Sequence, residues 1–333
     1  MKRNLMNPLI VLVNALLGPI ALAGAQSVTG LWDAVVTVNN VDVPFRMEFS
    51  GNGKALKGSF FNGDERVTST SGAIDHGAIV LSFDEYETRL EAQLADGILE
   101  GQYLRGTRGA PYPFRAKRFT PANADASNVP GIAGLWNVQV KSSKGESAWQ
   151  MIVRQSGAEA SAAILRVDGD TGTLTGRYAD GRFVLSHFSG ARPLRLELTP
   201  KADGTLAVIQ NKDDPLTAVR SELARARGLP EPSDPSQFTS VKDPTEPLRF
   251  NFPDLNGRLL SGEPKEAPEK LAQAVNLNSF PTTFFVGRDG RVRGVTAGFP
   301  GKASGKFHEE ATAEIIARIE RMLAEPVRTS SSP

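Results

Sequence analysis

Alternating hydrophobic and polar residues characterise the first two-thirds of this 333-residue chain. Runs such as 34–38 and 89–94 place apolar side chains at every second position, which is the period of a half-buried β-strand. Turns rich in Gly, Asn and Asp separate these runs at intervals of about ten residues. The pattern predicts antiparallel sheet, folded as a sandwich or a small barrel.

The β pattern occurs twice in the same order. Gly-Leu-Trp-Asp at 30–33 recurs as Gly-Leu-Trp-Asn at 134–137, 104 residues later, and an aromatic strand at 45–49 has its counterpart at 149–153. Because the order of these landmarks is kept, we interpret the two stretches as copies of one unit, each of about 100 residues, the size of a small domain. We expect the leading Trp of each copy to fill the interior of its sheet near one end.

The segments around the copies differ from them in composition. A polar, Pro-bounded linker covers 120–130, and Asp214-Pro215 predicts the start of a short helix that ends at Arg227. Five prolines in 230–247 predict an extended tether without packed elements. We therefore divide the chain into a signal segment 1–25, a first β-rich repeat 26–119, a second β-rich repeat 131–229, the tether 230–247, a C-terminal module 248–325 and a disordered tail 326–333.

A different pattern begins near residue 276, in the stretch NLNSFPTTFFVGRDGRVR. Pro281 precedes a short run of β-branched and aromatic residues, which is typical of a buried strand that starts at a proline. Asp289-Gly290 favours a two-residue hairpin turn. A second strand is predicted at 292–297, and an amphipathic helix near 309–324.

This order of proline, strand, Asp-Gly turn, strand and helix resembles the second half of a thioredoxin-like domain. The string SFPTTFFVGRDGRV is most similar to the secreted TlpA/ResA-like (redoxin) thiol–disulfide oxidoreductases, and 250–257 resembles the opening hairpin of that family. The resemblance covers about 247–324. It implies a cis peptide bond before Pro281, and it places Phe280, Pro281 and Thr282 where the family binds extended polypeptide.

One departure from the family changes the functional expectation. The family carries a strand, a helix and a Cys-x-x-Cys pair between the opening hairpin and the cis-proline. Here 259–261 runs almost directly into 262–266, and the chain contains no cysteine. Because the thiolate is the nucleophile in disulfide exchange, the chain as written cannot carry out the family's reaction. We therefore expect a truncated α/β thioredoxin-like module with no catalytic residue and no cofactor.

The first 25 residues predict export. Lys2 and Arg3 precede an apolar run at 9–22, and Ala23-Gly24-Ala25 forms an A-x-A cleavage site. Polar and helix-breaking residues interrupt the run, so it is too short to span a membrane comfortably. We expect a periplasmic or secreted mature protein that begins at Gln26, has no later membrane span and holds its core without disulfides.

Charge and motif content argue against several classes of function. Lys and Arg number 38 against 37 Asp and Glu, a net charge of +1, which argues against nucleic acid as the main partner. His76, His187 and His308 lie far apart without the spacing of metal ligands, and we expect them at the surface or in turns. No P-loop, dinucleotide fingerprint or serine-hydrolase elbow is present. We therefore expect neither a metal site nor nucleotide binding.

Three interpretations of the function follow. The first is an exported TlpA-like protein that is redox-inactive and binds extended polypeptide or another protein beside Pro281. The second is that the β repeats form a ligand- or partner-binding module and the C-terminal piece is a vestige. The third is that an internal segment near 260–262 is missing from the sequence and the full gene product is an active oxidoreductase, which sequencing the gene across these codons would reveal.

The truncation also predicts how the C-terminal module is held. A two-stranded hairpin with one covering helix is marginally stable alone. Another element must bury its apolar side chains, which include Phe284, Phe285, Ile319 and Leu323. The missing central strand leaves an unpaired strand edge. We expect the module either to dock on the second repeat or to pair with a partner strand, including one from a second copy of the chain.

The signal segment gives the first testable prediction. N-terminal sequencing of the expressed protein should find Gln26 as the first residue, because the A-x-A site lies directly before it. A membrane-bound product that keeps Met1 would contradict the expectation of cleavage.

Overall fold

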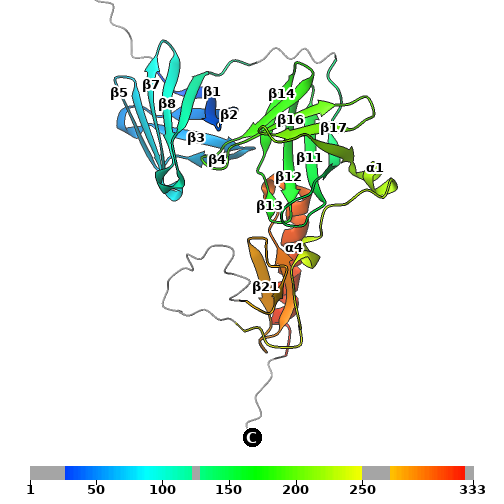
Figure 1. Ribbon diagram of the computed structural model, residues 1–333. Helices are drawn as coiled ribbons and strands as arrows, with labels where there is room; N and C mark the ends of the chain where they lie inside the picture. Colours follow the sequence, from blue (N-terminus) through cyan, green and yellow to red (C-terminus); the bar gives the residue numbers. More distant parts are fainter. Residues whose placement is uncertain (1–26, 122–127, 250–270, 327–333) are drawn as a thin grey trace, which may run out of the picture.

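A computed structural model describes residues 27–121, 128–249 and 271–326 (Figure 1). The signal segment, the opening hairpin expected at 250–257 and nearly all of the tail expected at 326–333 lie outside the described residues. The described fold is β-rich, as predicted: two large antiparallel sheets are followed by two two-stranded sheets and a C-terminal helix. Within these ranges, no helix is long and apolar enough to cross a membrane.

The first unit is a nine-stranded antiparallel sheet that curls around its own core. The strand order is β4-β3-β2-β1-β9-β8-β7-β6-β5, so each strand pairs with the next one in sequence except β4 with β5, and β1 also pairs with β9. Its strands are β1 (Gly30–Val38), β2 (Val41–Ser50), β3 (Lys57–Asn62), β4 (Glu65–Thr68), β5 (Ser71–Asp75), β6 (Ala78–Phe83), β7 (Thr88–Ala95), β8 (Ile98–Leu104) and β9 (Tyr112–Arg118).

The second unit is a closed eight-stranded barrel with the same order of strands. The ladder runs β11-β10-β18-β17-β16-β15-β14-β12, and β12 pairs with β11 to complete the ring. The short β13 pairs only with the end of β12. The strands are β10 (Gly134–Gln139), β11 (Ala148–Ser156), β12 (Glu159–Arg166), β13 (Gly169–Asp170), β14 (Leu174–Ala179), β15 (Arg182–His187), β16 (Leu194–Pro200), β17 (Leu206–Gln210) and β18 (Leu216–Arg220).

The two units differ at one seam. In the second unit β13 has two residues, so residues 159–162 of β12 remain free to pair with β14 and close the barrel. In the first unit the longer β4 occupies the edge of β3 from Ser59 to Asn62. Within residues 27–121, β3 and β5 form no ladder, and the Ser69 N–H donates to the Gly58 carbonyl at 2.8 Å across the seam. The two units therefore differ at this seam: a ladder crosses it in the second unit, whereas β3 and β5 of the first unit form none within residues 27–121.

The leading Trp of each unit lies in equivalent surroundings. Trp32 and Trp136 are 1% and 2% exposed. In each unit the indole N–H donates to the carbonyl four residues earlier, at 2.7 Å and 2.9 Å. A guanidinium covers each ring, Arg118 at 4.6 Å and Arg220 at 4.5 Å from the centroid, and also donates to carbonyls just before the first strand. The predicted burial of both Trp residues is confirmed, and the shared contacts support the duplication.

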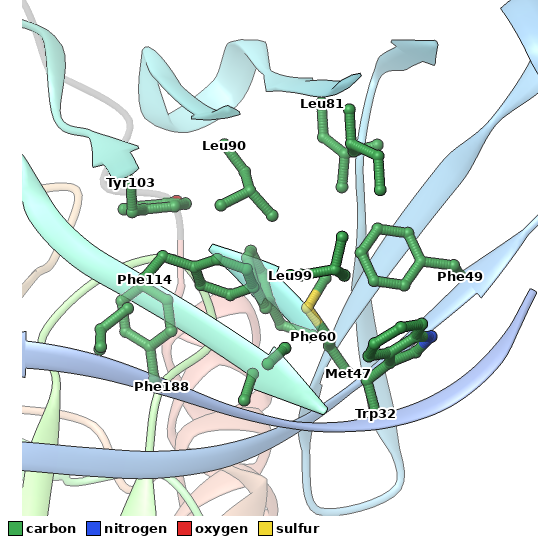
Figure 2. Close-up of a cluster of buried hydrophobic side chains, with 14 of the residues drawn as sticks. Trp32, Met47, Phe49, Phe60, Leu81, Leu90, Leu99, Tyr103, Phe114 and Phe188 are labelled. Carbon is green, nitrogen blue, oxygen red and sulfur yellow. The ribbon is translucent and has the colours of Figure 1, made fainter. Parts of the chain in front are cut away.

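One residue of the second unit completes the core of the first (Figure 2). Phe188, in the loop between β15 and β16, is 1% exposed and belongs to the hydrophobic core of the first unit. Its ring lies 4.8 Å from that of Phe45, 5.3 Å from that of Phe60 and 5.1 Å from that of Tyr103, measured between centroids. The two units therefore share a core at this point.

Hydrogen bonds between the units flank Phe188. The Tyr103 hydroxyl donates to the Gly190 carbonyl at 2.9 Å, and the Thr173 N–H donates to Asn62 Oδ1 at 2.8 Å. Burial raises the pKa of Tyr103 to about 12, so the hydroxyl keeps its proton and remains a donor at neutral pH. An apolar insertion with polar contacts beside it fixes the orientation of the first unit on the second.

The helix that follows the barrel is shorter than predicted. α1 covers Ser221–Ala226, whereas residues 216–220 form β18, which pairs with both β10 and β17. The prediction of a helix from Asp214-Pro215 was therefore wrong at its start. Barrel closure needs a final strand at this point, and the β-branched Thr217 and Val219 suit that strand.

The C-terminal part packs beside the barrel (Figure 1). Its elements are α2 (Pro235–Phe238), β19 (Ser240–Val241), β20 (Ala274–Val275), β21 (Thr282–Val286), β22 (Val292–Ala297) and α4 (Lys306–Leu323). The expectation that 230–247 lacks packed elements was wrong, because α2 packs against β22 and β19 pairs with β20. Asp234 begins α2 by accepting the Ser236 N–H at 2.8 Å, with a proline at the first helical position.

Two hydrogen-bonded contacts attach the C-terminal part to the barrel. The Ser304 N–H donates to the Asp170 carboxylate at 3.1 Å, and Asn278 Nδ2 donates to the Lys144 carbonyl at 3.2 Å. The C-terminal part thus docks on the second repeat, which is the first of the two outcomes expected for it.

Because Trp32 and Trp136 are equally buried, replacing either one should destabilise the protein by a similar amount. Trp32→Ala and Trp136→Ala should each lower the free energy of unfolding by about 3–5 kcal/mol, because each empties a large aromatic side chain from a core. Denaturant unfolding followed by circular dichroism measures this. Trp149→Ala, at a half-buried position, is the control and should cost less; a loss under roughly 1 kcal/mol at Trp32 or Trp136 would contradict the assignment.

Phe188 should stabilise the unit that it enters more than the unit that carries it. Phe188→Ala should destabilise the first unit by about 3–5 kcal/mol, because it leaves a cavity among aromatic rings there. Hydrogen exchange should speed up in β2, β3 and β8. Phe183→Ala, which empties the barrel core, is the matched control and should raise exchange in the second unit instead. Unchanged exchange in the first unit of Phe188→Ala would show that the insertion contributes little.

Candidate functional site

The sequence-predicted site residues lie together at the entry to β21. The peptide bond between Phe280 and Pro281 is cis. Phe280 is 41% exposed, Pro281 is exposed, and Thr282 is half-buried. The Thr282 hydroxyl donates to the Ser279 carbonyl at 2.6 Å and so fixes the turn before the strand. The three residues form a solvent-accessible entry to the C-terminal hairpin.

β21 has an unpaired edge in the described chain. It pairs with β22 on one side and, among residues 27–121, 128–249 and 271–326, with no strand on the other. The Gly298 N–H donates to the Pro281 carbonyl at 2.6 Å, so the backbone of Pro281 faces β22. Because the hydrogen-bonding direction alternates along a strand, the N–H and C=O groups of Thr282 and Phe284 point towards the unpaired edge.

An apolar groove of about 300 Å³ flanks β21, with α4 as its second wall. Leu323 is 66% exposed and Ile319 is 44% exposed, and α4 has no fully buried residue. The groove is lined by Phe284, Phe285, Val286, Gly287, Arg288, Ile319, Met322 and Leu323. Main-chain donors and acceptors therefore lie next to an apolar surface that solvent reaches.

Charged side chains hold α4 against the hairpin. The Arg318 guanidinium lies 5.0 Å over the Phe285 ring and close to Gly294, where a Cβ would collide with it. Arg293 pairs with Glu325 at 2.6 Å, and this hydrogen bond lowers the pKa of the Glu325 carboxyl. These contacts close the face of the hairpin under α4. The groove remains open because it lies at the β21 edge of this interface.

The histidines form no site. His76 is exposed, in a turn, as expected. His187 is 7% exposed, so the prediction of a surface or turn position was wrong for it. Its Nδ1 lies 3.3 Å from the Thr173 carbonyl oxygen, and burial lowers its pKa. Within the ranges that the structure describes, no cluster of three His, Asp or Glu residues could hold a metal ion.

The sequence identified part of the groove. Phe284, Phe285, Ile319 and Leu323 were expected to need cover, and all four line it. Arg288 and the other groove residues were not identified. Arg288 lies at the groove because it donates hydrogen bonds to main-chain carbonyls at the end of α4. No local sequence pattern indicates these long-range hydrogen bonds.

Comparisons with known proteins give no relative: no family model, no curated protein and no solved structure matches the chain. Its function is therefore inferred from the geometry of its own residues.

Proposed function

We propose that this chain is an exported, redox-inactive polypeptide-binding protein in which the unpaired edge of β21 captures an extended segment of another protein. The observation that carries the proposal is an apolar groove beside a strand edge that is unpaired within residues 27–121, 128–249 and 271–326. Strand addition draws its affinity from main-chain hydrogen bonds and its specificity from pockets for alternate side chains. The backbone groups of Thr282 and Phe284 would supply the main-chain hydrogen bonds, and the groove would supply the pockets for side chains.

The groove also favours a particular kind of segment. Its α4 wall consists of Ile319, Met322 and Leu323, which suit apolar side chains, and the flexible Met adapts to different shapes. Arg288 at the rim donates to the carbonyls of Leu323 and Glu325, so its charge is not neutralised by these partners. The preferred segment is therefore extended and apolar, with an acidic residue near Arg288.

A relationship to TlpA/ResA-like (redoxin) proteins is part of this proposal. It is supported by the order of Pro281, β21, turn, β22 and α4, which is the order of the resembling family. The open edge of β21 is where that family carries its central strand. Since the chain has no cysteine, disulfide exchange has no nucleophile here, and binding is the part of the family's activity that remains. Export is supported by residues 1–25.

A peptide-binding experiment tests the proposal. The probe is a fluorescently labelled ten-residue peptide of alternating apolar and polar residues with one Glu, and binding to the full chain is followed by anisotropy. Leu323→Asp should weaken binding at least about tenfold, because it places a charge in the groove. Leu323 is largely exposed, so the fold should be kept.

Two controls make the outcome decisive. Ile316→Asp, on the same helix at a 51% exposed position that does not line the groove, should bind like the unmodified chain. The same peptide with N-methyl groups at alternate residues cannot pair with a strand edge and should not bind. Equal binding of the methylated peptide, or no difference between the two Asp variants, would refute strand capture at β21.

A further inference from the structure

The two repeats carry different side chains at the same end of their interiors. In the first unit the inward positions at this end include Phe83 on β6 and Tyr103 on β8, both in the hydrophobic core, and Phe45 on β2, which is partly buried and packs against that core. Phe188 from the second unit packs on Phe45 and Tyr103. This end of the first unit therefore contains an aromatic side chain that comes from outside the unit.

The corresponding positions in the barrel are polar or amphipathic. Strand register identifies them: Trp149 opposite Val138 matches Phe45 opposite Ala34, and Gln210 opposite Leu196 matches Tyr103 opposite Leu90. His187, the last residue of β15, matches Phe83, the last residue of β6. At these matched positions the second unit thus carries Trp149, His187 and Gln210 where the first carries Phe45, Phe83 and Tyr103.

This end of the barrel is a cleft of about 320 Å³, within the size range of small-molecule sites. Its apolar side consists of Val140, Trp149 and Leu216, while Gln210 lies on its polar side. Lys141, Ser142 and the exposed Asp213 and Asp214 also line it. The mouth of a small barrel is a common position for a ligand.

The Arg166 guanidinium is not itself one of the lining residues, but it contacts two of them, Trp149 and Gln210. Arg166, the last residue of β12, covers the ring of Trp149 at 4.3 Å and donates from Nη2 to Gln210 Oε1 at 2.6 Å. Among the described residues, Arg166 Nε and Trp149 Nε1 are buried without a hydrogen-bond partner. Guanidinium has five N–H donors, so most of those of Arg166 have no acceptor in the described chain.

The nearest carboxylates are engaged elsewhere. Glu146 accepts the Val167 N–H at 2.8 Å and the Ser142 hydroxyl at 3.1 Å, and Asp168 pairs with Lys144. Burial lowers the pKa of the Arg166 guanidinium, and these two carboxylates raise it. Within the described ranges, neither lies within ion-pair distance of Arg166. The positive charge therefore has no direct counterion in the described part of the chain.

We propose that the mouth of the second barrel binds a small organic carboxylate with a planar, apolar body. The fork of Arg166 matches a carboxylate in geometry and charge, and the Gln210 amide lies beside it. The apolar body lies against Trp149 and Leu216, at the end of the barrel where the first unit takes the ring of Phe188. The proposal is independent of strand capture at β21.

Intrinsic fluorescence of the full chain tests this site. Benzoate is the probe, and benzamide is its uncharged isostere. Trp149 lines the cleft whereas Trp32 and Trp136 are buried in their own cores, so a ligand in the cleft should change the emission of Trp149. Benzoate should bind at least about tenfold more tightly than benzamide, because only benzoate carries a negative charge that pairs with the guanidinium.

Variants assign the effect to Arg166. Arg166→Gln should weaken benzoate binding at least about tenfold and leave benzamide binding unchanged. Arg177→Gln, at an exposed position on β14, is the matched control and should change neither. The melting temperature of Arg166→Gln checks that the variant folds, since the substitution also removes the hydrogen bond to Gln210 and the contact with the Trp149 ring.

Three results would overturn the proposal. The first is equal affinity for benzoate and benzamide. The second is an Arg166→Gln variant that binds benzoate as tightly as the unmodified chain. The third is the absence of any fluorescence change with benzoate up to about 20 mM, a concentration well above the dissociation constants of specific small-ligand sites.

Discussion

The insertion of Phe188 into the first unit is the interaction on which the arrangement of the β units depends. The first sheet is not closed between β3 and β5, and its core ends in aromatic rings on the side of the second unit. Burying an aromatic ring there removes apolar surface from water at about 25 cal/mol per Å². The bond from Tyr103 to Gly190 then restricts the orientation of the loop. Separating two units that share a core would expose apolar surface of both units to water, which costs free energy.

This shared core also explains why the two copies differ. The end of the first unit is filled by its neighbour, so Phe45 and Tyr103 serve packing. The same end of the barrel is free of that constraint, and Trp149 and Gln210 stand at the matching positions. The half-buried Arg166 lies beside them. Desolvating its charge costs free energy of folding unless a partner compensates it, so stability alone does not explain an arginine at this position. Equivalent positions of the two copies can therefore have different roles: Phe45 and Tyr103 stabilise the first unit, and Trp149 and Gln210 belong to the proposed ligand site of the second.

Much of the β architecture could be predicted from sequence, because strand alternation and the repeated Gly-Leu-Trp motif are local signals. The positions of Trp32 and Trp136 followed from the repeat alone. The role of Phe188 could not be predicted, since nothing local distinguishes a residue that fills its own core from one that fills a neighbour's. The start of α1 was misplaced because Asp214-Pro215 is a sound local cap signal that the barrel's need for β18 overrides. For the candidate site, the sequence identified Pro281 and the apolar face of α4 but not the basic rim.

The edge of β21 is informative because proteins usually protect such edges. Common protections are a covering helix, a charged side chain on the edge or a proline that removes a donor. Here Pro281 lies before the strand and leaves the edge groups of Thr282 and Phe284 unaffected, and α4 flanks the edge with Ile319 and Leu323. An open edge beside exposed apolar residues favours aggregation unless a partner strand occupies it. The edge of β21 that is unpaired in the described part of the chain, beside the exposed Ile319 and Leu323, therefore fits the proposed capture of an extended segment.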